Sequence, residues 1–454
     1  MKHTNRIREA DIINWAAEEF ERVDLGDQRR NKRLIKMMGD LSRNIGASIV
    51  QCCEGWAATK AGYRLLSNEA VEWPAILEPH RVQTVARMAQ YERVLCIQDT
   101  TELDFTGHPS VQGLGRLNHD YRHGMYCHPT VAASESGVML GVLDAWMWAR
   151  QAKGEPDIRE STRWTEGYQR VAELKAELSG TEIVYVADRE ADIRELMTAA
   201  QQQENIVHWL VRAKHNRVTG DGKLWDRLSN AEILGTVQFT LARTATRKAR
   251  PVELTLRRES VTLPATKQYP ALTVTALLAR EEHPPENETP IEWRLLTDET
   301  LTTLADAVLR IEWYRLRWMI ELFFRTLKTG CKVEELQLST KERLEKALVI
   351  YMIIAWRVLM LMTLGRDVPE LPCEVIFDRE EWQAAWIVSQ KKPLPPNPPT
   401  LGEMILIVAR FGGFLARKND GNPGAEALWR GLQRIRDFAE GINAASQAYE
   451  IKLE

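Results

Sequence analysis

The pattern of hydrophobic and polar positions changes along the chain. Between residues 10 and 70, apolar residues recur at helical spacing, as at Leu34, Met38 and Leu41, which predicts short helices. From Tyr91 onward, short apolar runs alternate with helical patterns. We expect strands up to Asp99 and at 128–134, 138–149 and 184–186, and a helix at 161–178. This alternation is typical of an α/β fold.

Residues 205–300 have a different pattern, in which apolar and polar positions alternate in runs separated by Gly or Pro. This predicts an all-β insertion into the α/β region. A helical run follows at 341–365, and the proline-rich segment 391–399 is expected to form a stiff connector. The last unit, 401–454, is expected to be helical. The fold class is therefore α/β, with an all-β insertion and a helical domain at each end.

Composition limits the partners that the whole chain can attract. Its 454 residues are too many for one hydrophobic core, and the formal net charge is −3, so nucleic-acid affinity must come from local patches. Residues 22–66 form one such patch, with nine basic and four acidic residues. A second basic patch lies in the β-rich segment 205–300. The candidate DNA contacts in these patches are Arg29, Arg30, Arg33, Arg212 and Lys214.

The cysteines and the apolar segments favour a cytoplasmic protein. None of the six cysteines forms a C-x-x-C pair, which indicates free thiols in a reducing compartment. The most apolar stretch, 347–356, is ten residues long before Arg357 interrupts it. A membrane span needs ~20 apolar residues, so a buried helix is expected and no membrane partner.

Five polar residues recur in the run IEWYRLRWMIELFFRTLKTG, with spacings of three, four, four and three. On a single α-helix they would occupy a stripe about 80° wide. One carboxylate among three cations and a phenol suits a metal ion beside a phosphate ester. A salt-bridged surface helix is an equally compatible interpretation of the helix alone. The five residues are Tyr314, Arg317, Glu321, Arg325 and Lys328.

Asp99 and Asp188 each end an apolar run predicted to be a strand. Ligands gather at the carboxyl ends of strands in α/β sheets, so these aspartates and Glu321 could form a hard-oxygen site. Two Mg²⁺ ions about 3.5–4 Å apart would suit phosphoryl transfer, with Mn²⁺ able to substitute. Spacing leaves alternatives open, because nearby carboxylates compete for each position. They are Glu102 and Asp104 near Asp99, and Glu190 and Asp192 near Asp188.

A third cluster, in the segment LNHDYRHGMYCH, contains His119, His123, Cys127 and His128. Its spacing matches no common zinc signature, and no second ligand pair follows. We interpret these residues as structural. No P-loop or G-x-S-x-G motif is present, which argues against a nucleotide-binding fold and against a serine hydrolase.

Several motifs together resemble one family. The helix matches Tyr-x2-Arg-x3-Glu-x6-Lys, and QDTTELDF, VADREADI and ETPIEWRLLT precede it in the order found in the insertion-sequence-four family of bacterial DDE transposases. RFGGF and ALWRGLQ near the C-terminus are also similar, as are LGDQRR and GWAATKAGYRLL near the N-terminus. The resemblance covers nearly the whole chain.

That resemblance implies a ribonuclease-H-like catalytic core with a DDE triad of Asp99, Asp188 and Glu321. It implies Mg²⁺-dependent cleavage of transposon ends through a DNA hairpin, joining of the 3′ ends to target DNA, and a homodimer that holds two ends. Trp293 would stack on an extruded base. The remaining signature residues would bind phosphate, namely Tyr314, Arg317 and Lys328.

The implied domains are an end-binding domain at 1–70, a catalytic domain at 71–366 with its insertion at about 205–300, and a dimerisation domain at 367–454. Arg325 departs from a relative within that family, which has lysine at this position. Two alternatives stay open: a structure-specific nuclease on the same core, and a regulatory DNA-binding relative that does not cut.

Overall fold

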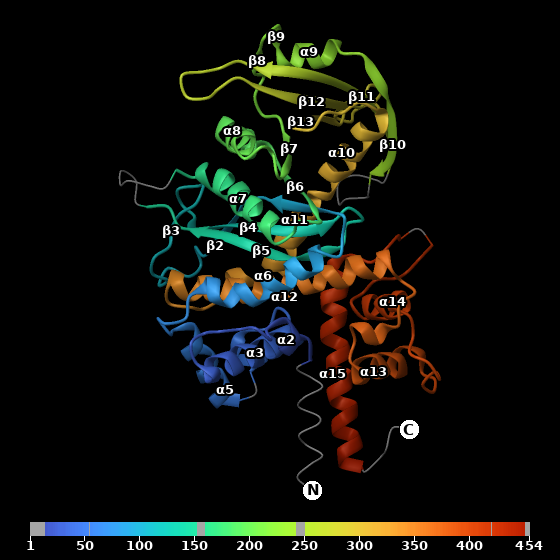
Figure 1. Ribbon diagram of the computed structural model, residues 1–454. Helices are drawn as coiled ribbons and strands as arrows, with labels where there is room; N and C mark the ends of the chain where they lie inside the picture. The colour runs from blue at the N-terminus through green and yellow to red at the C-terminus, as the bar shows by residue number, and fades with distance from the viewer. Residues whose placement is uncertain (1–13, 54, 152–158, 242–249, 419, 450–454) are drawn as a thin grey trace.

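The computed structural model describes residues 14–53, 55–151, 159–241, 250–418 and 420–449. It is a mixed α/β structure in which a β-sheet lies between helical layers (Figure 1). The N-terminal part is helical. Its helices are α2 (Asn14–Glu19), α3 (Gln28–Arg43), α4 (Ile49–Cys52), α5 (Gly55–Leu66) and α6 (Trp73–Met88).

The centre of the sheet is built from strands before residue 213. Their bounds are β1 (Arg93–Gln98), β2 (Thr101–Asp104), β3 (Gly115–Arg116), β4 (His123–Ser134), β5 (Met139–Trp148), β6 (Glu182–Ala187) and β7 (His208–Arg212). β5, β4 and β1 form an antiparallel meander, whereas β6 and β7 run parallel to β1. The register pairs Gln98 with Ala187, so Asp99 and Asp188 follow adjacent strands at the same edge of the sheet.

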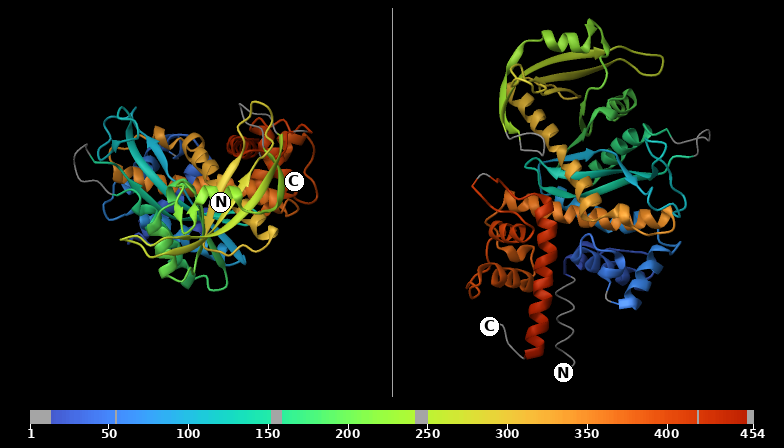
Figure 2. Two further views of the ribbon diagram at one scale, coloured as in Figure 1. Left: turned by 90° about the horizontal axis from the view of Figure 1, so that it is seen from above. Right: turned by 180° about the vertical axis from the view of Figure 1, so that it is seen from behind.

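The β-rich segment extends this same sheet. It contains β8 (Val218–Thr219), β9 (Gly222–Lys223), α9 (Leu224–Asn230), β10 (Ile233–Leu241), β11 (Arg250–Leu263), β12 (Leu272–Arg280) and β13 (Glu292–Thr297). β13 pairs antiparallel with β7, and β12, β11 and β10 follow outward (Figures 1 and 2). The expectation of an all-β insertion is wrong in two respects. α9 interrupts it, and the strand at 208–212 belongs to the parallel part because it pairs with β6.

Side chains of β1 alternate between two hydrophobic cores, as the period of two in a strand requires. Leu95 and Ile97 pack on the side of α12 (Lys341–Asp367), whereas Val94 and Cys96 pack on the side of α7 (Thr162–Glu173). The 3-10 turn η1 (Leu174–Ala176) continues α7, and α8 (Arg194–Gln202) covers the same face.

α12 is apolar and long enough to span a membrane, with a mean hydropathy of 2.2 over its best 18-residue window. In the structure 83% of that window is buried inside the protein, so α12 is the core helix that the sequence predicts at 341–365. Thr340 caps its N-terminus by accepting from the backbone N–H of Arg343.

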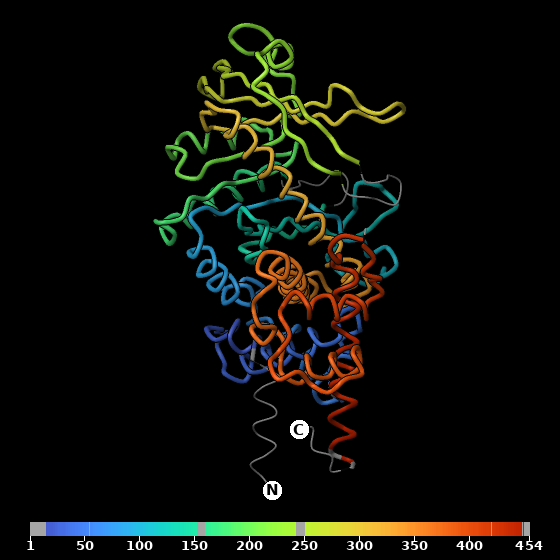
Figure 3. Tube along the Cα trace, turned by 90° about the vertical axis from the view of Figure 1, so that its right-hand side faces the viewer, coloured from blue at the N-terminus to red at the C-terminus, as the bar shows by residue number. Residues whose placement is uncertain are grey.

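The C-terminal part contains α13 (Arg379–Gln390), α14 (Leu401–Phe411) and α15 (Ala425–Tyr449). The proline-rich connector separates α13 from α14 without a helix or strand of its own. α15 extends away from the sheet beside the N-terminal helices (Figure 3). There Arg436 donates to the carbonyl of Ser42 on α3. All six cysteines are free and buried.

Candidate active site

The run predicted to be one helix is divided at Arg317. α10 (Leu304–Leu316) ends before it, α11 (Trp318–Arg325) begins after it, and a π-helical turn, η3 (Thr326–Gly330), follows. At the junction the N–H of Arg317 bonds to the carbonyl of Tyr314, three residues back, so the backbone tightens. The expectation of a single helix is therefore wrong. The five-residue stripe divides into two groups with different surroundings.

Arg317 lies at the centre of the first group. Its Nη1 lies 2.8 Å from Asp99 Oδ2 and 3.5 Å from Glu321 Oε1, and its Nη2 lies 3.7 Å from Asp188 Oδ2. The guanidinium is buried, with 8% of its side chain exposed, whereas Glu321 is 41% exposed. The three predicted triad residues thus come together from β1, β6 and α11 around one cation.

Tyr314 completes this group from the last turn of α10. Its hydroxyl donates to Asp188 Oδ1 at 3.2 Å. Burial, together with the charge of Asp188, raises the pKa of Tyr314 to about 12, so the phenol keeps its proton at neutral pH. The pKa of Asp99 is raised to about 6, chiefly by burial and further by the charges of Glu321 and Asp188, against the lowering effect of Arg317. A cluster of three carboxylates therefore carries more negative charge than one guanidinium balances.

The carboxylates that compete in sequence are held by other partners. Glu102 and Asp104 both bind Arg122, at 2.8 Å each. Asp192 is buried and binds Arg217, and it also accepts hydrogen bonds from backbone N–H groups that follow β7. This leaves Asp99 and Asp188 as the strand-end aspartates that face Glu321.

Arg325 and Lys328 form no part of this cluster. Arg325 is 60% exposed and lies 2.6 Å from Glu426 on α15. Lys328, in the π-helical turn, lies 3.7 Å from Glu334. Glu334 in turn accepts from the backbone N–H of Asp104, which follows the Asp99 loop. The two cations flank the cluster and do not enter it.

Trp293 is the middle member of an aromatic column that reaches the cluster through Tyr314. Its ring lies 5.7 Å from that of Tyr314 in an edge-on arrangement, and 6.0 Å from that of Phe239 in a stacked one. Arg315 covers Phe239 at 4.3 Å. Phe239 therefore covers part of Trp293, and a base would have to share that surface.

Sequence reasoning missed Trp318, which directly follows Arg317. Its side chain is 62% exposed, which is unusual for so large an apolar group. Arg317 directly precedes Trp318, and Glu321 follows it by three residues. Both belong to the cluster, so this closeness in the sequence was the available signal.

The predicted N-terminal DNA contacts differ in their availability. Arg29 is exposed but pairs with Asp27, the residue that caps α3, at 2.8 Å. Arg30 donates to the carbonyl of Leu25. Arg33 lies on the same helix, α3, and is half-buried.

The two predicted contacts after β7 lie nearer the cluster. Arg212 Nη1 lies 4.0 Å from Asp188 Oδ1, so this residue extends the cationic border of the cluster. Lys214 is exposed, and its backbone N–H is bound to Asp192.

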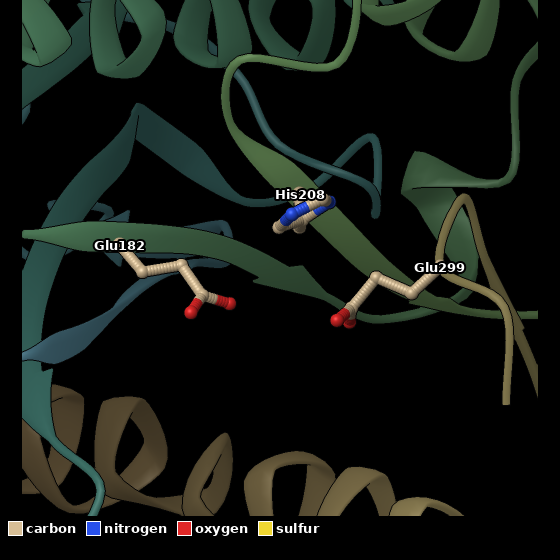
Figure 4. A group of neighbouring side chains, drawn as sticks. All are labelled: Glu182, His208 and Glu299. Carbon is tan, nitrogen blue, oxygen red and sulfur yellow. The ribbon is translucent and has the colours of Figure 1, made fainter.

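Within the described part of the chain, one group of potential metal ligands has its atoms within 4.8 Å of one another: Glu182, His208 and Glu299 (Figure 4). Each already has a partner of opposite charge, since Glu182 binds Arg93, His208 binds Asp298 and Glu299 binds Arg310. Glu182 begins the strand that Asp188 follows, about 20 Å away at strand spacing. We interpret the group as an ion-pair network at the opposite edge of the sheet.

The chain matches three family descriptions. Residues 12–71 match "Transposase DNA-binding", residues 157–357 match "Transposase DDE domain" and residues 353–451 match "Transposase Tn5 dimerisation domain". Asp188 and Glu321 lie inside the second match, whereas Asp99 lies before it.

Among solved structures, the chain is similar to a piggyBac transposase synaptic complex with hairpin DNA. The two are 10% identical over 79% of this chain and 73% of that chain, with a TM-score of 0.36. The three family matches follow one another along the chain and together cover residues 12–71 and 157–451. The chain therefore carries the DNA-binding, DDE and dimerisation domains of a DDE transposase.

Proposed function

We propose that the protein is a cut-and-paste DNA transposase of the insertion-sequence-four type, with Asp99, Asp188 and Glu321 as its catalytic metal ligands. The observation that supports this most directly is the convergence of the three carboxylates on Arg317, within a chain that matches transposase domains. The strand order β5-β4-β1-β6-β7, with β6 and β7 parallel to β1, supports a ribonuclease-H-like core.

The residues fit Mg²⁺ or Mn²⁺. Carboxylate oxygens are the ligands these ions prefer, and Asp99, Asp188 and Glu321 supply such oxygens around a single guanidinium. Two such ions would activate the attacking hydroxyl group and offset charge on the leaving oxygen.

This chain's own cations position the DNA. Arg317 would exchange part of its contact with the carboxylates for a phosphate, Tyr314 keeps Asp188 oriented, and Lys328 and Arg212 border the strand. Trp293 would stack on an extruded base, which is worth ~1–3 kcal/mol. Exposed Trp318 offers a second stacking surface beside the scissile phosphate.

In this proposal residues 1–70 bind the ends of the element, residues 71–366 cut and join DNA, and residues 367–454 pair two protomers. The ends would be released through a hairpin intermediate. The protein would act in the cytoplasm, on double-stranded donor and target DNA.

One reconstitution tests the proposal. The purified protein and an Asp188→Ala variant are incubated with Mg²⁺ and a plasmid that carries the terminal repeats flanking the gene. Excision and insertion by the unaltered protein alone are expected. Cleavage without insertion would show a nuclease, and end binding without cleavage would show a regulatory protein. Equal activity of both proteins would refute the role of Asp188.

A further inference from the structure

The loops that carry Asp99 and Asp188 are built alike. Each aspartate accepts a hydrogen bond at 2.8 Å from the backbone N–H of the next residue, Thr100 or Arg189. Each loop also presents one side chain toward the N-terminal turn of α7: the Thr100 hydroxyl and the Glu190 carboxylate. Both of these side chains meet Arg163.

Arg163 is the second residue of α7 and is 6% exposed. Its Nε donates to Thr100 Oγ1 at 3.0 Å, and its Nη2 donates to Glu190 Oε2 at 2.6 Å. The third nitrogen, Nη1, donates to the carbonyl of Glu160 just before α7. One planar guanidinium thus connects both aspartate loops to one helix, and its three contacts leave it little freedom to turn.

A buried polar chain fixes the Thr100 hydroxyl on its other side. Gln98 Oε1 is an acceptor, so His128 Nε2 must donate to it at 3.2 Å, and the Tyr185 hydroxyl donates to it at 2.8 Å. In the neutral imidazole the second nitrogen, Nδ1, is then an acceptor. It lies 2.9 Å from Thr100 Oγ1, so the hydroxyl donates to His128 and accepts from Arg163.

Each side chain in this hydrogen-bond network has a partner, and the network is shielded from solvent. Gln98, His128 and Tyr185 are each at most 2% exposed. α7 approaches it closely because residue 167 is glycine: a Cβ there would lie 2.4 Å from the Gln98 amide. Buried and fully paired networks hold their members in one geometry, since any displacement leaves a polar group unpaired. His128, first noticed as a candidate metal ligand, has this structural role.

We propose that Arg163 is a positioning residue that sets the spacing between the Asp99 and Asp188 loops, and hence the affinity of their carboxylates for a divalent metal ion. The inference rests on the proposed function, in which these aspartates bind metal. Residues that orient metal ligands without touching the ion typically change metal affinity by about 10- to 100-fold when replaced.

The test is calorimetric titration of the full-length, DNA-free protein with Mn²⁺. Arg163→Gln should weaken Mn²⁺ binding about tenfold or more. Arg163→Lys can hold one loop but not both, so its Mn²⁺ affinity should lie between that of the unaltered protein and that of Arg163→Gln. Arg170→Gln is the matched control. Arg170 lies two turns further along α7 and pairs with Asp144, so its loss should leave Mn²⁺ affinity unchanged.

Two further variants decide the matter even if Arg163→Gln does not fold. Thr100→Val and Glu190→Gln each remove one link. Each should weaken Mn²⁺ binding, and their effects should not add to that of Arg163→Lys, because all act through the same contacts. Unchanged Mn²⁺ affinity in these variants, with cooperative unfolding retained, would overturn the inference.

The same titration separates this inference from the proposed function. Binding that is lost in Asp188→Ala but unaffected in the Arg163, Thr100 and Glu190 variants would overturn the positioning role alone. Absence of Mn²⁺ binding by the unaltered protein would overturn the proposed metal site and this inference together.

Discussion

Arg317 Nη1 lies 2.8 Å from Asp99 Oδ2, inside a cluster where three carboxylates share this one guanidinium. The arginine is the more buried partner, with 8% of its side chain exposed against 20% for Asp99. A buried charge that loses its partner is costly, so Arg317 stabilises the folded cluster as well as facing the proposed DNA strand.

Replacing Arg317 by Gln should therefore destabilise the protein most when no divalent ion is present. We expect a loss of about 3 kcal/mol in EDTA, because the three carboxylates lose the buried cation that they share. Mg²⁺ should raise the melting temperature of this variant more than that of the unaltered protein. Thermal unfolding in both conditions measures this, with Arg315→Gln as the control. An equal Mg²⁺ response in all three proteins would contradict the shared site.

Tyr314→Phe removes only the hydroxyl that donates to Asp188. A hydrogen bond to a charged group is worth about 1.5–3 kcal/mol, so single-turnover cleavage should slow about 10- to 150-fold. DNA affinity should hold, since the ring and its contact with Trp293 remain. Tyr121→Phe, at an exposed position, is the comparison. Cleavage at the unaltered rate would show that Asp188 needs no such support.

The sequence predicts where Asp99 and Asp188 lie in the fold, because the ends of strands follow from the local pattern of apolar residues. An apolar run that ends in Asp is a strand end, and the parallel pairing of β1 and β6 brings two such ends together. The core helix α12 is predictable for the same reason, since ten consecutive apolar residues, 347–356, lie within it.

Other features depend on contacts that no local pattern encodes. The helix is interrupted at Arg317, where the backbone N–H bonds to the carbonyl three residues back, although the residue spacing suits one helix. Arg325 meets Glu426 across 101 residues of sequence, and Arg163 meets Thr100 across 63. The all-β expectation missed α9, whose seven residues are too few to show a helical period.

Arg325 lies outside the Tyr-Arg-Glu-Lys signature, and two roles can be distinguished for it: binding DNA, or holding α15 in place. Its ion pair with Glu426 is exposed, so it adds only about 0.2–1 kcal/mol to stability and is easily exchanged for a phosphate. If Arg325 binds DNA, Arg325→Ala should weaken binding and lower the slope of log affinity against log salt by about 1. Glu426→Ala should strengthen binding, because it frees the arginine.

Filter binding over a series of salt concentrations measures both effects. Arg430→Ala serves as the control, since Arg430 also pairs with Glu426 but lies on α15. An unchanged salt slope in Arg325→Ala would assign this residue to the contact between α11 and α15 alone.

His80 gives the fold a dependence on pH that is separate from catalysis. The ring is fully buried against Trp356, and its Nε2 accepts a hydrogen bond at 2.9 Å from the backbone N–H of Val142. Its Nδ1 faces Glu19, which also binds Arg87. Because Nε2 is an acceptor, the imidazole is neutral in the fold. Burial lowers the pKa of His80, more than Glu19 raises it.

The unfolded chain therefore binds a proton below about pH 6.5 that the folded chain does not, and stability must fall as the pH drops through that value. Between pH 7.5 and 5, His80 should account for a loss of up to about 2 kcal/mol. His80→Gln should be less stable at pH 7.5, because Glu19 loses a donor, but its stability should depend less on pH over this range. Urea unfolding of both proteins at several pH values gives the difference. Parallel curves for the two proteins would mean that His80 carries its proton in the fold, with the Val142 contact broken.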